Sequence, residues 1–200
     1  MQRQVFIWRE LVLVLWAAWL LYWAFSAANA KTTQRRESLA SRLSYFLPLL
    51  LGAWLTFAPR LRWGWLTMPL LPEAPARYLL ALALVALGLG FSVWARAHLG
   101  RNWSAAVTLK HGHELICSGP YAYVRHPIYS GLLVAFLGNA IESGAPCALL
   151  GLAIVLISFV RKLRMEETLM RATFPAQYPR YSAEVPALLP FTKARRSAPR

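Results

Sequence analysis

The chain has 200 residues, of which 58% are hydrophobic, and a formal net charge of +14. A bilayer core of ~30 Å needs about 20 apolar residues per helix, and several apolar runs approach that length. This composition predicts an all-α integral membrane bundle and excludes open strands within lipid, where unpaired backbone groups cost too much. No nucleic-acid partner is expected, because the cations flank apolar runs and no basic, aromatic soluble module is present.

Five apolar segments predict about five transmembrane helices. The first has the outline of a secretory signal peptide, with Ala28-Asn29-Ala30 following it. It is long and rich in Trp and Tyr, however, and the cations Lys31, Arg35 and Arg36 follow, so we expect a retained helix. The five segments are residues 11–28, 43–58, 78–94, 127–141 and 147–160.

The later segments carry two further expectations. Gly88 and Gly90 in the third segment would let a neighbouring helix approach closely. The fourth segment is short for a membrane helix, so the fourth and fifth form a hairpin that need not span fully as two independent helices. The chain changes character after Val160, where the fifth apolar segment ends, and we expect a charged helix over 161–173, then an irregular tail broken by prolines.

The charges predict the orientation. Five helices place residues 29–42, 96–126 and the chain from 161 on one side of the membrane, and these hold 17 of the 22 lysines and arginines. That excess predicts that this side is cytoplasmic. The basic tail (Lys193, Arg195, Arg196 and Arg200) would then meet anionic lipid headgroups.

The densest polar stretch is residues 119–131, directly before the fourth segment. Pro127 is suited to open a helix with His126 at its cap, and free N–H groups there would attract an anion such as a carboxylate. An interfacial aromatic belt is the alternative interpretation. Three tyrosines could stack on a flat ring and donate hydrogen bonds: Tyr121, Tyr123 and Tyr129.

Two adjacent carboxylates, Glu166 and Glu167, follow the fifth segment. Carboxylates near a membrane exit suit a cationic ligand group. The alternative is a solvated helix with ion pairs four residues apart, such as Lys162 with Glu166. Both alternatives stay open on these residues alone.

The histidines do not predict a metal site. His111 and His113 with Cys117 fit no familiar zinc spacing. No metal is therefore expected, and His113 is interpreted as a loop residue or a cofactor contact.

The order of motifs resembles the isoprenylcysteine carboxyl methyltransferase family over roughly residues 78–191. Arg-His-Pro-x-Tyr with a downstream Glu-Glu pair is fairly specific in combination. The matching elements are Leu99–Ser104, His113–Ile116, Gly119–Tyr121, Arg125–Gly131, Arg164–Glu167, Phe174, Tyr178, Tyr181, Val185-Pro186 and Leu189-Pro190.

The resemblance implies a membrane methyltransferase whose cofactor is S-adenosylmethionine. Residues 1–77 would be N-terminal transmembrane helices and residues 78–200 one methyltransferase core, whose cytoplasmic C-terminal segment covers the cofactor. A lipophilic or lipid-linked substrate would enter laterally from the bilayer. Cofactor contacts carried over by position are His113, Glu114, Leu115, Ile116, Tyr121, His126, Pro127, Ile128, Tyr129 and Glu166.

On the substrate side the resemblance implies Lys162, Arg164 and Glu167. Relatives have a basic residue four before the cofactor glutamate; here it is Lys162, which cannot reproduce the bidentate fork of an arginine. The alternative is that Arg161 or Arg164 takes its place. The bacterial inner membrane, with the site facing the cytoplasm, is the expected location.

The acceptor is the open part of the function. The sequence offers no dedicated base, which favours a carboxylate or thiolate acceptor over an amine or hydroxyl. Three alternatives are a phospholipid amine N-methyltransferase, a nicotinamide-dependent lipid reductase on a related scaffold, and a non-catalytic membrane partner. The sequence has no Gly-rich phosphate loop, which a nicotinamide nucleotide would be expected to need.

Overall fold

The computed structural model describes residues 2–27, 33–35, 38–58, 64–100, 103, 109–110 and 114–190. Its elements confirm the predicted helical membrane bundle. Two short strands, β1 (Thr33–Arg35) and β2 (Leu109–Lys110), pair antiparallel between the helices. The helices are α1 (Gln2–Ala27), α2 (Leu39–Phe57), α3 (Pro75–Leu99), α4 (Pro127–Ser143), α5 (Pro146–Thr173) and α6 (Gln177–Glu184), with 3-10 turns η2 (Trp65–Thr67) and η4 (Gly119–Ala122).

Four of the described helices are long and apolar enough to cross a membrane: α1, α2, α3 and α5. The chain is an integral membrane protein. Helix α4 has 17 residues and is shorter than these, as its apolar segment indicated. The predicted domain boundary after residue 77 falls inside the first turn of α3.

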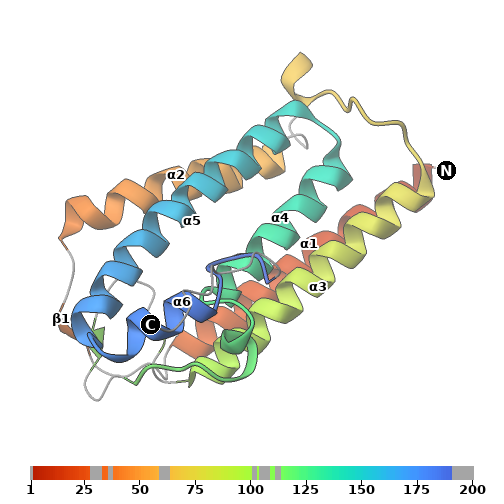
Figure 1. Cartoon of the computed structure of the whole chain (residues 1–200). Helices are drawn as coiled ribbons and strands as arrows, with labels where there is room; N and C mark the ends of the chain where they lie inside the picture. Colours follow the sequence, from red (N-terminus) through yellow and green to blue (C-terminus); the bar gives the residue numbers. More distant parts are fainter. Residues whose placement is uncertain are drawn as a thin grey trace.

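Helices α1 and α3 lie on one side of the bundle, α2 and α5 lie on the other, and α4 lies between these two pairs (Figure 1). Helix α3 packs along α4 and also against α1, and α2 packs along α5. Helix α1 reaches α4 as well, through Arg9 with Glu142 and Trp16 with Phe136. Gly88 allows the first crossing, because a Cβ there would overlap the backbone of Gly131 and Ala135 on α4. Gly90, also predicted to serve close packing, faces open space, so that part of the prediction is wrong.

Helix α5 corrects the predicted end of the fifth segment. It runs without a break from Pro146 to Thr173, because no proline interrupts residues 147–173 and the charged residues there are good helix formers. One rigid helix therefore carries both the apolar Phe159 and the polar Glu166. The tail predicted to be irregular forms α6, where Pro179 lies in the first turn and its missing N–H is not needed.

One end of the bundle gathers the polar elements. The C-terminal ends of α1 and α3, the start of α4, the charged end of α5 and α6 lie together there, opposite the chain's N-terminus (Figure 1). Strand β1 pairs with β2 at this end. Two of the three segments predicted to share one side of the membrane are thus joined.

Candidate active site

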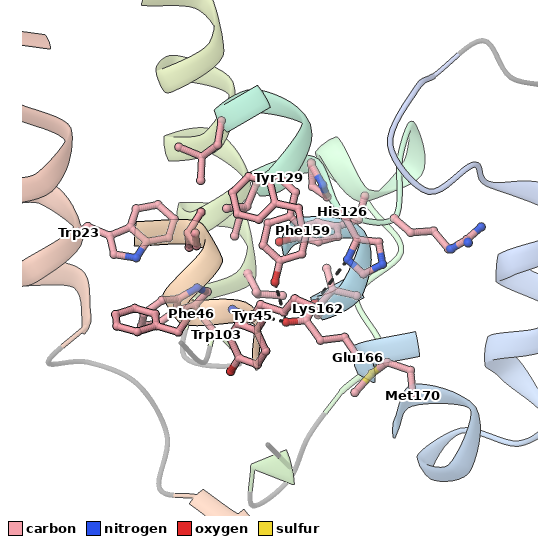
Figure 2. A pocket seen from close by; sticks show the side chains of 18 of the residues that line it. Trp23, Tyr45, Phe46, Trp103, His126, Tyr129, Phe159, Lys162, Glu166 and Met170 are labelled. Atoms are coloured by element: carbon pink, nitrogen blue, oxygen red, sulfur yellow. Dashed lines mark hydrogen bonds and ion pairs between the residues drawn. The ribbon is translucent and has the colours of Figure 1, made fainter. Parts of the chain in front are cut away.

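A cavity of about 610 Å³ opens at the polar end of the bundle and is lined from all six described helices. Figure 2 shows its polar side chains at the ends of α4 and α5, facing aromatic side chains of α1 and α2. Most of the lining is apolar. The charged or ionisable polar side chains are confined to one end: Glu114, Arg125, His126, Lys162 and Glu166, with the hydroxyls of five tyrosines.

His126 is the N-cap residue of α4, and its ring lies between two carboxylates. Its Nδ1 lies 3.5 Å from Glu166 Oε2 and its Nε2 lies 3.3 Å from Glu167 Oε1. The ring stacks on Tyr129 with centroids 5.5 Å apart. Burial alone would lower the pKa of His126, but hydrogen bonds and charge from Glu166 and Glu167 outweigh it and raise that pKa.

Glu166 presents its carboxylate to the cavity. Tyr129 donates its hydroxyl to Glu166 Oε1 at 2.6 Å, and Lys162 Nζ lies 3.8 Å from the same oxygen. The Lys162 ammonium lies over the rings of Tyr45 and Tyr129, 5.3 and 5.5 Å from their centroids. The cavity therefore has an anion and a cation side by side, framed by aromatic faces.

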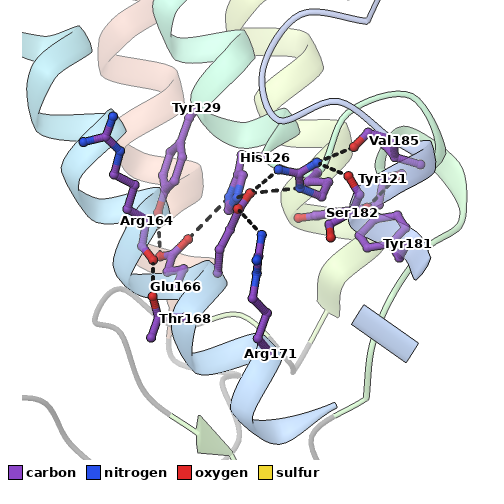
Figure 3. Close-up of polar contacts among 12 residues, drawn as sticks. Tyr121, His126, Tyr129, Arg164, Glu166, Thr168, Arg171, Tyr181, Ser182 and Val185 are labelled. Atoms are coloured by element: carbon purple, nitrogen blue, oxygen red, sulfur yellow. Dashed lines mark hydrogen bonds and ion pairs between the residues drawn. The ribbon is translucent and has the colours of Figure 1, made fainter. Parts of the chain in front are cut away.

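Glu167 does not line the cavity, although it is the next residue. Arg125 donates from Nε and Nη2 to Glu167 Oε1 at 2.9 and 2.6 Å. Arg171 Nη2 lies 3.8 Å from Glu167 Oε2. The Arg125 guanidinium also donates to the carbonyls of Ser182 and Val185 (Figure 3). Glu167 thus holds the C-terminal segment in place through Arg125.

Residues 185–190 run across the start of α4, and we name them the C-terminal strap. The backbone N–H groups of Arg125 and His126 donate to the carbonyls of Pro186 and Ala187 at 2.9 and 3.0 Å. Ser130 Oγ donates to the Leu188 carbonyl at 2.7 Å. These contacts fix the strap beside the site.

The strap alters the predicted anion site at the start of α4. It occupies the N–H groups of Arg125 and His126. The first-turn N–H groups of Ile128 and Tyr129 have no acceptor within the helix, because an α-helix leaves its first donors unpaired. The backbone donors offered to an anion are therefore the N–H groups of Ile128 and Tyr129, two and three residues beyond the N-cap His126.

Tyr121 sits in η4 as a buried, neutral hydroxyl. Burial raises its pKa and that of Tyr181, whose hydroxyl donates to the Tyr121 carbonyl at 2.6 Å. The Tyr121 ring, with Leu115 and Ile116, gives the cavity a flat apolar wall close to the polar groups.

The structure brings most of the predicted site residues together. Arg164 is exposed and lies outside the lining, pointing away from the site in Figure 3. His113, the motif residues Arg101, Asn102 and Ser104, and the basic tail lie outside the described residues. Those that line the cavity are Glu114, Leu115, Ile116, Tyr121, His126, Pro127, Ile128, Tyr129, Lys162 and Glu166.

Sequence reasoning missed the contribution of α1 and α2. Trp16, Trp19 and Trp23 line the cavity from α1. Their spacing of three and four residues places them on one helix face, a signal that distinguishes a packed face from a scattered interfacial belt. Within the part of the chain that the structure describes, no group of three or more His, Cys, Asp and Glu side chains is placed to hold a metal ion.

Comparison with known proteins points to one family. Residues 76–177 match the family model for phospholipid methyltransferases. Protein-S-isoprenylcysteine O-methyltransferase of Schizosaccharomyces pombe is 32% identical over 113 residues, 55% of this chain and 48% of that protein. The corresponding B protein of Arabidopsis thaliana is 30% identical over 95 residues, 46% of this chain and 48% of that protein.

A third relative carries a different description. The cobalt-zinc-cadmium resistance protein CzcN of Cupriavidus metallidurans is 35% identical over 107 residues, 52% of this chain and 49% of that protein. The chain spans about half the length of the curated relatives it matches. The relatives confirm the resemblance inferred from the motifs, and the family match covers α3 to α5 while leaving α1 and α2 outside it.

Proposed function

Because the chain belongs to the phospholipid methyltransferase family, we propose that it is a membrane methyltransferase that transfers a methyl group from S-adenosylmethionine to a lipophilic acceptor. One observation carries the proposal: the Glu166 carboxylate, bonded to Tyr129 and beside His126, stands at the polar end of a deep apolar cavity. A cationic donor and an apolar acceptor could meet at that boundary.

The residues present fit the methyl donor. S-adenosylmethionine supplies an electrophilic methyl group on a sulfonium. Glu166 would hold its ammonium, and the first-turn N–H groups of Ile128 and Tyr129 would receive its carboxylate. Leu115, Ile116 and Tyr121 would pack against the adenine. His113, Glu114 and Pro127 complete the proposed contacts.

On the acceptor side we assign Lys162. Its ammonium lies at the border between the polar end and the apolar cavity, over two tyrosine rings. There it would bind the carboxylate of an isoprenylcysteine-like or other lipid-linked acceptor. A carboxylate nucleophile needs no base, so the protein's work is to align the two reactants and exclude water.

The roles expected from the sequence for Glu167 and Arg164 change in the proposal. Glu167 is a positioning residue, since it acts through Arg125 and His126 and does not line the cavity. Arg164 is not retained, because its exposed side chain lies outside the cavity. We further propose that the site faces the cytoplasm of a bacterial inner membrane, on the basis of the charge bias.

The second candidate is methylation of a phospholipid amine, favoured by the description of the family model. An amine must lose a proton to act as a nucleophile, and a base would be needed for it. The ammonium of Lys162 would also repel a cationic headgroup. These two considerations favour the carboxylate acceptor.

A transfer assay tests the proposal. The purified chain in lipid nanodiscs receives S-adenosylmethionine with a labelled methyl group and either an N-acetylated prenylcysteine or phosphatidylethanolamine. We expect base-labile label on the prenylcysteine, as a methyl ester gives, and at least about tenfold less of it with Glu166→Gln when the donor is not saturating. Label on phosphatidylethanolamine alone would select the second candidate, and transfer to neither would overturn the proposal for these acceptor classes.

A further inference from the structure

The first two helices do not form a packed pair. Helix α1 packs on α3 and α2 packs on α5, while among the described residues α1 and α2 make at most isolated contacts with each other. One side of the cavity is therefore lined by α1 and α2, which do not pack against each other, whereas α3 packs closely on α4 and α2 on α5.

The residues facing each other there are both cavity-lining and exposed. Leu20 of α1 is 59% exposed, and Phe46 and Leu50 of α2 are 40% and 50% exposed, yet all three line the cavity. A side chain can be both only where the cavity opens outward. These three residues define what we name the α1–α2 opening, and it faces the direction that lipid would occupy.

The opposite end of the cavity is closed by aromatic rings. Trp16 of α1 meets Phe57 of α2 at a centroid distance of 5.7 Å and Phe136 of α4 at 4.9 Å. These are the lining residues of α1, α2 and α4 that lie furthest from the polar end. We name Trp16, Phe57 and Phe136 the aromatic floor.

The helix rise gives the depth of the cavity. The lining of α2 extends from Tyr45 to Phe57, which at 1.5 Å per residue is about 18 Å. The lining of α4 from Pro127 to Phe136 gives about 14 Å. Both values are close to half of the ~30 Å hydrocarbon core of a bilayer, so the cavity has the depth of about one leaflet.

The cavity volume limits what can fill it. About 610 Å³ lies within the ~300–1,000 Å³ typical of pockets that hold one drug-sized ligand. The donor would take the polar end, and the remaining space has room for one hydrocarbon chain beside the aromatic side chains. Two acyl chains would exceed it.

From these observations we propose that the hydrocarbon tail of the acceptor enters through the α1–α2 opening, and that the aromatic floor sets the longest tail accepted. The inference rests on the proposed function and adds the route by which the tail enters and the residues that limit its length. The inference adds no covalent step to the methyl transfer, since the hydrocarbon tail is only bound.

A series of acceptors with different tail lengths tests the floor. Wild-type protein and Phe57→Ala are assayed for kcat/KM with N-acetylated cysteines carrying two, three, four or five isoprene units. We expect kcat/KM of the wild type to fall by about tenfold or more once the tail exceeds the cavity. Phe57→Ala should move that fall to a longer tail, and Phe136→Ala provides a second, independent floor variant.

A matched pair of substitutions tests the opening. Leu50→Trp adds bulk at the α1–α2 opening, whereas Leu47→Trp adds the same bulk to an exposed α2 position outside the lining. We expect Leu50→Trp to lower kcat/KM for long-tailed acceptors about tenfold with the donor Kd unchanged, and Leu47→Trp to leave both unchanged. Phe91→Ala, an α3 position outside the lining, is the corresponding control for the floor variants.

The outcomes separate the inference from the proposed function. Absence of donor binding and of transfer by the wild type would overturn the proposed function itself. Transfer with the same tail-length profile in wild type, Phe57→Ala and Phe136→Ala, each checked for donor binding, would overturn the length limit alone. Equal effects of Leu50→Trp and Leu47→Trp would overturn the entry route.

Discussion

Glu166 and Glu167 are neighbours in sequence and contact the same histidine, but only Glu166 lines the cavity, whereas Glu167 is bound by Arg125. If Glu166 holds the donor's ammonium, Glu166→Gln removes a charge-assisted hydrogen bond worth about 1.5–3 kcal/mol. That is a loss of about 10- to 150-fold in donor affinity. The glutamine oxygen can still accept from Tyr129, so the free energy of unfolding should fall by only about 1 kcal/mol.

Glu167→Gln should give the opposite pattern. It leaves the Arg125 guanidinium without its carboxylate, and both side chains of the pair are only 12% exposed. Breaking a fully buried ion pair costs about 3–5 kcal/mol. Arg125 keeps two carbonyl acceptors and some contact with solvent. We therefore expect the free energy of unfolding to fall by about 2 kcal/mol. Donor affinity should fall by less than about fivefold, or ~1 kcal/mol.

The assay pairs calorimetric titration of S-adenosylhomocysteine, the demethylated donor, with chemical unfolding in the same detergent. Glu184→Gln, at an exposed carboxylate of α6 with 72% side-chain exposure, is the matched control and should change neither quantity. Equal affinity losses in Glu166→Gln and Glu167→Gln, or a larger loss in Glu167→Gln, would refute the placement of the donor ammonium on Glu166.

Three further predictions follow from single contacts. Gly88→Ala should lower the free energy of unfolding by about 1–3 kcal/mol because its Cβ would overlap α4, whereas Gly90→Ala should raise it by up to about 1 kcal/mol; equal thermal shifts would contradict the packing. The pKa of His126 is raised in the folded protein. The protonated His126 therefore contributes to the free energy of unfolding below its ordinary pKa, and this contribution is lost as pH rises through the raised value. Unfolding at several pH values measures the loss. A donor ammonium beside Glu166 would also displace the His126 proton, so donor affinity should rise with pH and the binding heat should depend on the buffer's ionisation enthalpy; a buffer-independent heat would contradict this. Lys162→Met should raise KM for a carboxylate acceptor about tenfold while the donor Kd stays within about twofold, and an unchanged KM would remove Lys162 from the acceptor site.

The apolar segments predicted the long helices well, because burial in lipid demands a length that the sequence displays directly. The fifth apolar segment was predicted to end at Val160, and the helix continues to Thr173, since a change from apolar to charged residues alters the surroundings of a helix without ending it. Pro179 was taken as a breaker, yet a proline in the first turn of α6 costs no hydrogen bond.

The site was predicted where its residues are close in sequence. The stretch from Tyr121 to Tyr129 and the later glutamates were found from motif order, and the structure brings Tyr129 and Glu166 into contact. Sequence could not separate Glu166 from Glu167, because adjacent residues on a helix point about 100° apart and only packing decides which one faces the cavity. Trp16 and Phe57 were missed because their part in the cavity depends on where α1 and α2 stand relative to α4.

The placement of the donor ammonium on Glu166 is tested most directly by a crystal structure of the protein with S-adenosylhomocysteine bound. We expect ligand density between Tyr121, His126 and Glu166, with the amino group of the ligand on the Glu166 carboxylate and its sulfur facing the apolar cavity. Density at any other place on the chain, or an empty cavity at saturating ligand, would contradict it.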